Sequence, residues 1–207
     1  MERPTIVIEH LEDEIGTWLL LEYRHVSLIH GRRHTIFTNI PSRYHDILKR
    51  YGYVYTESIV DLVKNGVIPA DKIIVLDPIA DRELSRKETM GSYIVIGGIL
   101  GDHPPKGRTW SMLTSRLAPL GVEWRNIGKG QYSIDGAAYY VFHLWRHGLK
   151  GYRYIDGVNI KTSNGYIRLP FRYPVVDGKP LLAPGLIEYL TTGRIPRELV
   201  EELELPQ

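Results

Sequence analysis

The sequence predicts an α/β fold with a mostly parallel sheet flanked by helices. Short apolar runs rich in β-branched residues alternate along the chain with segments of helical periodicity. Each run is too apolar to have a solvent-facing side, which is typical of parallel strands buried between layers of helices. Four runs are predicted as strands: Thr5–Ile8, His34–Thr38, Ile73–Leu76 and Tyr93–Ile96.

Helices are predicted between and after these strands. The first covers Trp18–Ile29, and Gly31 stands where this helix would end. The last helix of the core ends before Gly148, and Ser133 or Asp135 is placed to cap its start. This last helix covers about residues 137–147. The other predicted helices cover Ser42–Tyr51, Ser58–Lys64 and Thr109–Leu117.

A smaller extension is predicted at about residues 151–207. Two strand-like pieces, Val158–Lys161 and Tyr166–Leu169, flank the turn sequence Asn164-Gly165, which is a strong hairpin signal. We therefore expect an antiparallel β-ribbon followed by short helices. These helices are predicted at Pro184–Leu190 and Glu198–Leu203.

The composition is that of a globular protein able to bury a core, with 43% hydrophobic and 24% charged residues among 207. Lys and Arg number 26 against 24 Asp and Glu, so no overall charge attracts polyanions. The absence of cysteine excludes disulfides, thiolate zinc sites and thiol nucleophiles. No signal peptide or membrane span is recognisable, and we expect a cytoplasmic protein.

A glycine-rich loop, Gly97-Gly98-Ile99-Leu100-Gly101-Asp102, follows the fourth predicted strand. Glycine lets the backbone approach a ligand closely, and ligands favour the carboxyl ends of parallel strands. The spacing matches neither the dinucleotide fingerprint nor the phosphate-binding loop of nucleotide triphosphatases. On spacing alone, a tight turn stiffened by Pro104-Pro105 is an equally good interpretation.

Residues 96–109, Ile-Gly-Gly-Ile-Leu-Gly-Asp-His-Pro-Pro-Lys-Gly-Arg-Thr, resemble the signature loop of one SPOUT branch of S-adenosylmethionine-dependent methyltransferases. This branch occurs in archaea and eukaryotes and includes a fungal protein-arginine methyltransferase that modifies a small-subunit ribosomal protein. The resemblance spans most of the chain, including residues 8–12, 18–23, 131–137 and 169–173.

The resemblance implies one SPOUT domain over residues 1–207, with a trefoil knot at about 90–150 that holds S-adenosylmethionine in a bent conformation. Segment 131–137 reads Gln-Tyr-Ser-Ile-Asp-Gly-Ala where the family pattern is closer to Gln-Met-Thr-Thr-Asp-Thr-Ala, so individual side-chain contacts there stay open. By motif, the cofactor would be bound by Gly97, Gly98, Leu100, Gly101, Ile127, Gly128, Gln131, Tyr132, Ser133 and Ala137.

Acidic residues are expected on the acceptor side of the site. Glu9 lies at the carboxyl end of the first predicted strand, directly after Ile8, Glu22 lies on the next helix, and Asp102 belongs to the glycine loop. If they converge, they would orient a guanidinium by paired hydrogen bonds and repel phosphate. We therefore expect an arginine acceptor, with these three carboxylates as catalytic residues and Glu9 or Asp102 as proton acceptor. Substrate-binding roles are expected for His10, Tyr23 and Arg108.

RNA methylation is the alternative, because basic residues near Gly31 and after the glycine loop could form a rim that holds RNA backbone. A second alternative is a non-catalytic knotted adaptor that binds RNA or the ribosome. Expected partners are a ribosomal or RNA-associated protein, or RNA directly. A monomer is favoured over a homodimer, no metal site is expected, and Glu12-Asp13-Glu14 is interpreted as a solvated loop. The basic residues that would hold RNA backbone in the first alternative are Arg24, Arg32, Arg33, His34, Lys106 and Arg108.

Overall fold

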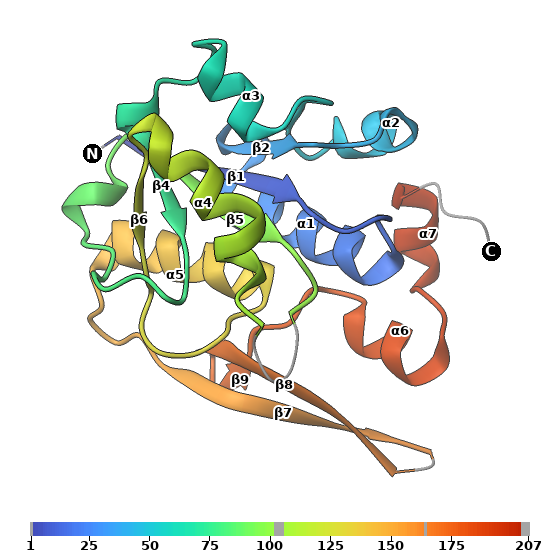
Figure 1. Ribbon diagram of the computed structural model, residues 1–207. Helices are drawn as coiled ribbons and strands as arrows, with labels where there is room; N and C mark the ends of the chain where they lie inside the picture. The colour runs from blue at the N-terminus through green and yellow to red at the C-terminus, as the bar shows by residue number, and fades with distance from the viewer. Residues whose placement is uncertain (1, 102–105, 164, 204–207) are drawn as a thin grey trace.

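A computed structural model describes residues 2–101, 106–163 and 165–203, and its core is a six-stranded sheet (Figure 1). The strand order is β3-β2-β1-β5-β4-β6, and each neighbouring pair is parallel. The predicted parallel α/β architecture is confirmed. The short edge strands β3 and β6 were not predicted. The strands are β1 Thr5–His10, β2 Thr35–Thr38, β3 Tyr53–Val54, β4 Ile73–Leu76, β5 Tyr93–Gly98 and β6 Glu123–Arg125.

Helices cover both faces of the sheet: α1 and α5 lie on one side, and α3 and α4 on the other (Figure 1). Alternation along β1 sends Ile6 and Ile8 into the core shared with α1 and α5. Val7 packs in the opposite core, with residues of α3 and α4. The helices are α1 Thr17–His30, α2 His45–Leu48, α3 Ile59–Lys64, α4 Ser115–Leu117, α5 Ile134–His147, α6 Leu186–Thr192 and α7 Arg197–Leu203.

Helix α5 begins and ends where its sequence signals predict. The Ser133 hydroxyl accepts a hydrogen bond from the Gly136 amide at 3.2 Å, which satisfies a backbone donor at the start of the helix. Gly148 ends the helix with φ 65°, a conformation that favours glycine. Residues 133–136 are thereby held in a fixed position beside the carboxyl ends of the strands.

Two predicted helices are shorter or of another type. The segment predicted as Ser42–Tyr51 contains a 3-10 turn at Ser42–Tyr44 and only four α-helical residues in α2. The chain turns back after α2 so that β3 can pair with β2, and a side-chain carbon at Gly52 would lie 2.5 Å from the Thr35 carbonyl oxygen. The segment predicted as Thr109–Leu117 starts with a π-helical turn at Trp110–Thr114 before α4.

The predicted hairpin is confirmed and is longer than expected. Strand β7, Tyr154–Thr162, pairs antiparallel with β8, Gly165–Val176, and β9, Lys179–Pro180, adds a short third strand. The β7–β8 ribbon extends beyond the main sheet (Figure 1). Its inner face packs against Trp18, Leu182 and Leu190 through the apolar side chains of Ile160, Leu169 and Phe171.

The C-terminal helix is tied to the first helix by an ion pair. The Glu202 carboxylate accepts two hydrogen bonds from the Arg24 guanidinium, both at 2.8 Å, and a third from the Tyr51 hydroxyl at 3.0 Å. Arg24 is therefore engaged within the protein. Among the described residues, every helix is too short or too polar to span a membrane.

Candidate functional site

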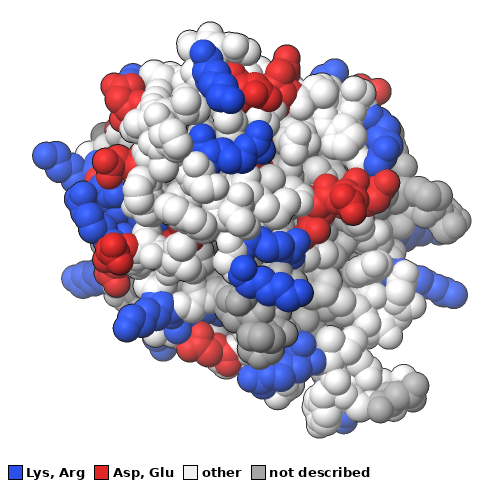
Figure 2. Space-filling model, in the orientation of Figure 1, with Lys and Arg blue, Asp and Glu red and all other residues white. Residues whose placement is uncertain are grey.

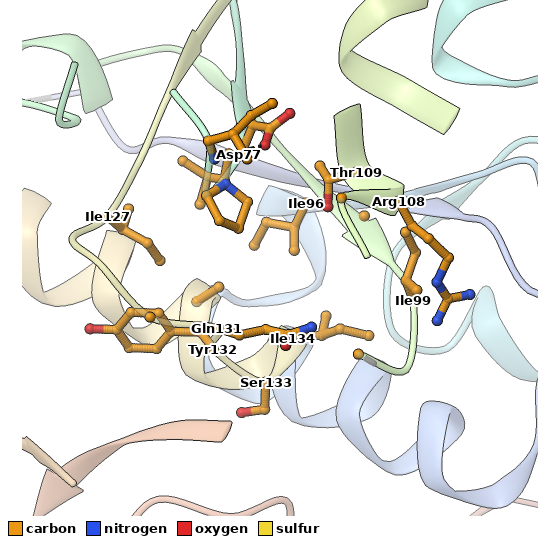
Figure 3. A pocket seen from close by; sticks show the side chains of 18 of the residues that line it. Asp77, Ile96, Ile99, Arg108, Thr109, Ile127, Gln131, Tyr132, Ser133 and Ile134 are labelled. Atoms are coloured by element: carbon orange, nitrogen blue, oxygen red, sulfur yellow. Dashed lines mark hydrogen bonds between the residues drawn. The ribbon is translucent and has the colours of Figure 1, made fainter. Parts of the chain in front are cut away.

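A cavity of about 320 Å³ lies at the carboxyl ends of β4 and β5. Three parts of the chain line it: residues 76–79 after β4, residues 96–101 with 106–109 around the glycine loop, and residues 127–137 before and within α5. Asp77 lies across the cavity from Gln131 and Ile134, and Arg108 lies at one edge beside Ile99 (Figure 3). Ligands of parallel α/β proteins bind at this edge of the sheet.

Most of the residues expected to bind the cofactor lie together around this cavity. Gly98 and Leu100 do not line it. The backbone of Gly98 instead packs against the Tyr23 hydroxyl, and the exposed Leu100 donates its amide to Glu12 at 3.0 Å. The expected residues that do line the cavity are Gly97, Gly101, Ile127, Gly128, Gln131, Tyr132, Ser133 and Ala137.

Close backbone packing explains why the loop after β5 needs glycine. A side-chain carbon at Gly101 would collide with the Gln131 amide and would lie 2.7 Å from the Phe171 ring. Neither group is a freely moving surface side chain, since Phe171 is buried and Gln131 lines the cavity. Gly101 therefore allows the glycine loop to lie directly against the segment that precedes α5.

The segment after β4 was not predicted to belong to the site. The Asp77 carboxylate is buried, and it accepts hydrogen bonds from the Thr114 hydroxyl at 2.5 Å and the Ile79 amide at 3.1 Å. The rule that ligands bind at the carboxyl ends of parallel strands could have identified it, since Asp77-Pro78 follows such a strand. Other lining residues outside the prediction are Leu76, Ile79, Ile96, Ile99, Lys106, Gly107, Thr109, Gly130 and Ile134.

Arg108 joins Leu100 of the glycine loop to Glu12. Its guanidinium donates to the Leu100 carbonyl at 2.5 Å and to the Glu12 carboxylate at 3.1 Å. Glu12 also accepts from the Leu100 amide, so the interpretation of Glu12 as a merely solvated residue is wrong. Asp102, one of the expected catalytic residues, lies outside the described residues.

Glu9 is buried at the end of β1, on the side of the sheet that α3 covers. One carboxylate oxygen accepts from the Thr38 hydroxyl at 2.5 Å and from the Ile59 amide at 2.9 Å. Burial raises the pKa of Glu9 to about 7, although these two hydrogen bonds act in the opposite direction. Ile59 is the first residue of α3, so Glu9 stabilises the start of that helix.

Glu22 is buried on the other side of the sheet. Its carboxylate accepts from the Trp18 indole at 2.7 Å and from the amide of Ile134, the first residue of α5, at 3.1 Å. Burial, and then repulsion from Asp135, raise the pKa of Glu22 to about 8. The expected convergence of Glu9 and Glu22 is therefore absent: they lie on opposite faces of the sheet because Glu9 shares the face of Val7.

His10 and Tyr23 form a buried pair below the glycine loop. The His10 ring nitrogen Nδ1 and the Tyr23 hydroxyl are 2.9 Å apart, and the Tyr23 ring stacks on Phe37. Burial lowers the pKa of His10 and raises the pKa of Tyr23. Neither side chain lines the cavity. Their contact with each other instead joins β1 to α1.

Metal binding finds no support in the described part of the chain, where no three His, Asp or Glu side chains are grouped as ligands. His143 and His147 lie close on α5, but the His143 ring nitrogen Nε2 is 3.1 Å from the Lys150 carbonyl oxygen. The cavity offers glycine backbone, apolar side chains and few polar groups, which is the composition of an organic cofactor site.

Comparisons with known proteins agree with this geometry. A family model described as protein arginine N-methyltransferase SFM1-like matches residues 5–195. Protein arginine N-methyltransferase SFM1 of Saccharomyces cerevisiae is 28% identical over 204 residues, covering 89% of this chain and 92% of the yeast protein.

Solved structures show the same architecture. Yeast SFM1 complexed with SAH aligns with a TM-score of 0.76 and 25% identity, over 90% of this chain and 94% of that chain. The complex of yeast SFM1 with SAM gives a TM-score of 0.78 and 24% identity, over 93% and 92% of the two chains. A dual specific Trm10 from Thermococcus kodakaraensis aligns with a TM-score of 0.52 and 17% identity, over 68% of this chain and 91% of that chain. This shows similarity of fold alone.

Proposed function

Because the chain belongs to the SFM1-like family of protein arginine N-methyltransferases, we propose that it transfers the methyl group of S-adenosylmethionine to an arginine side chain of a protein. The chain is an S-adenosylmethionine-dependent methyltransferase. The observation that carries the proposal is the family match over residues 5–195, which includes all three chain segments around the cavity.

The residues around the cavity fit this cofactor. A volume of about 320 Å³ with a mainly apolar lining suits a nucleoside held among aliphatic side chains. Ile96, Ile127 and Ile134 would contact the adenine ring, and backbone groups of Gly97 and Gly128 would provide hydrogen bonds without steric conflict. When bound, the cofactor's sulfonium supplies an activated methyl group, so the protein's remaining task is to align the acceptor and to remove a proton.

The acceptor needs a carboxylate, because a guanidinium holds its proton to above about pH 12 and must lose it as the carbon–nitrogen bond forms. We assign this role to Glu22 or Asp102. Glu22 lies directly behind the cavity wall through its hydrogen bond to Ile134. A bound guanidinium would lower the raised pKa of Glu22 and ionise it, so that the base forms when the substrate is present.

We assign indirect roles to the other expected residues. Glu9 stabilises the start of α3, and the His10–Tyr23 pair supports the backbone of Gly98. Arg108 links Leu100 to Glu12 at the edge of the cavity and would contact a substrate bound there.

RNA methylation has less support. Arg24 is paired with Glu202, and Arg32 donates to the Lys49 carbonyl at 2.9 Å, so these two residues are engaged within the protein. Figure 2 shows Lys and Arg side chains interspersed with Asp and Glu on the visible face, without a broad basic surface. Strong attraction for RNA backbone would require such a surface.

Finer aspects of the proposal follow from the resemblance to SPOUT proteins. The substrate would be a ribosomal or RNA-associated protein, and the chain would act as a cytoplasmic monomer. Residues 1–207 would form a single domain whose segment at about 90–150 is threaded as a trefoil knot.

The decisive experiment transfers labelled methyl groups from S-adenosylmethionine into a cell lysate, in separate samples later treated with protease or ribonuclease. We expect protease-sensitive label that is recovered as methylarginine after acid hydrolysis. Gly101→Val is the matched negative control, because a side chain there collides with Gln131. Label that survives protease and is lost to ribonuclease would replace this proposal with RNA methylation.

Calorimetry with S-adenosylhomocysteine tests the cofactor assignment separately. Binding by the wild-type chain and its loss in Gly101→Val would support the cavity as the cofactor site. An absence of wild-type binding would leave only the non-catalytic adaptor.

A further inference from the structure

Arg172 of β8 contacts the back of the cofactor cavity. Its backbone amide donates to the Gln131 carbonyl at 2.7 Å, and a parallel bridge joins it to Tyr132. Gln131 and Tyr132 both line the cavity, whereas Arg172 does not. A strand of the extension is thus hydrogen-bonded to the segment that forms one cavity wall.

The Arg172 guanidinium is held firmly on this outer side. It donates to both carboxylate oxygens of Asp156, at 2.6 and 2.9 Å, and lies over the Tyr154 ring at 3.8 Å. Paired hydrogen bonds and ring stacking together fix its plane. The Arg172 side chain is only 12% exposed, whereas that of Asp156 is 62% exposed, so the ion pair lies at the surface with the guanidinium on its buried side.

The fixed guanidinium in turn defines the backbone of the cavity wall. A side-chain carbon at Gly130 would lie 2.7 Å from the central guanidinium carbon, and Gly130 has φ 142°, which L side chains rarely adopt. A side-chain carbon at Gly128, which has φ 88°, would lie 3.8 Å from one terminal nitrogen of the same guanidinium. Gly130 therefore allows residues 128–132 to lie directly against the Arg172 guanidinium.

We propose that Arg172, held by Asp156 and Tyr154, is a positioning residue that keeps residues 128–132 in the shape that binds the cofactor. The proposal deepens the proposed function and rests on it, because the ligand is S-adenosylmethionine. It makes the ribbon a structural part of the cofactor site. Arg172 does not line the cavity, so its removal should affect cofactor affinity more than the chemical step.

The test compares Arg172→Met with Arg168→Met, which changes an exposed arginine on the same face of β8. Affinity for S-adenosylhomocysteine is measured by calorimetry, and kcat and KM for S-adenosylmethionine are measured with a methylarginine readout. If residues 128–132 adopt the binding shape about a tenth of the time in Arg172→Met, the dissociation constant and KM rise about tenfold while kcat changes little. Arg168→Met should behave as wild type.

Hydrogen exchange gives a readout without ligand. We expect faster exchange in residues 127–133 of Arg172→Met and unchanged exchange in β1 and β5, which also shows that the variant is folded. Asp156→Asn should show the same effects more weakly, and Arg172→Lys should fail to restore affinity because an ammonium cannot pair and stack in this way. Wild-type affinity in Arg172→Met, or an equal loss in Arg168→Met, would overturn the inference. An absence of binding by the wild-type chain would instead overturn the proposed function on which it rests.

Discussion

Substituting Glu9 by glutamine should remove a pH-dependent cost of folding. Both hydrogen bonds to Glu9 end on the same carboxylate oxygen, so the carbonyl oxygen of glutamine can accept them from Thr38 and Ile59. The substitution therefore leaves the contacts in place and removes only the ionisable group. Glu9 is 1% exposed, so solvent screens its charge little.

The sign and size of the effect follow from the raised pKa. Folding favours the protonated form, so the folded state binds more protons than the unfolded state between the ordinary glutamate pKa of 4.5 and about 7. The stability that protonated Glu9 contributes is complete below the unfolded-state pKa of 4.5 and is lost as the pH rises through the folded-state pKa of about 7. A rise in pKa from 4.5 to about 7 corresponds to about 3 kcal/mol, since each pKa unit is worth about 1.4 kcal/mol.

Urea unfolding of wild type and Glu9→Gln between about pH 5 and pH 8 measures this effect. Relative to wild type, the free energy of unfolding of Glu9→Gln should increase by about 2–3 kcal/mol across that range. The change is smaller than the full effect because wild type loses part of this stability below about pH 5. Taking the difference cancels the contribution of Glu22. In the exposed control Glu14→Gln, where hydrogen bonds from Tyr44 and Arg43 lower the pKa, no such gain should occur. A difference that stays constant with pH would refute the burial argument for Glu9.

Three further outcomes are expected. Gly101→Ala should abolish binding of S-adenosylhomocysteine and also lower the melting temperature, because its methyl group collides with Gln131 at the cavity and with the buried Phe171 ring; calorimetry below the melting temperature checks this, and normal binding would contradict the packing argument. Tyr173→Phe should stabilise the fold by about 1 kcal/mol in urea unfolding, because the buried Tyr173 hydroxyl has no partner among the described residues; a loss of more than about 1 kcal/mol would show that the hydroxyl is satisfied. Glu22→Gln should lower kcat by about a hundredfold or more and remove a rise in kcat/KM with pH, whereas Glu9→Gln should keep most of the activity; equal losses in both variants would argue against Glu22 as the base.

Local signals in the sequence were sufficient for most of the fold. The buried strands are recognisable from continuous apolar runs, and α5 from its cap at Ser133 and its end at Gly148. The two- and three-residue strands β3 and β6 could not be found in this way. Such short strands exist only because a longer neighbour provides hydrogen bonds, and the identity of that neighbour is a property of the whole sheet.

The site was less predictable because its side chains act through contacts distant in sequence. The resemblance directed attention to the glycine loop and to Gln131, both of which line the cavity. It gave no indication that Glu9 and Glu22 lie on opposite faces of the sheet, which follows from the direction of one side chain on β1. Arg172 was recognisable only as part of a matching segment, because its partners lie on another strand and in the loop before α5.

The strand order also has a consequence for the nascent chain. Strand β1 occupies the middle of the sheet, yet one of its two edges is completed only by β5. At about 5–20 residues per second, translation leaves that apolar edge without its partner for several seconds or more. The cavity is completed later still, when the segment before α5 and then β8 have left the ribosome tunnel. Products of translation interrupted before β8 should therefore be inert towards the cofactor and prone to capture by chaperones, and affinity for the cofactor should appear only after β8 has emerged.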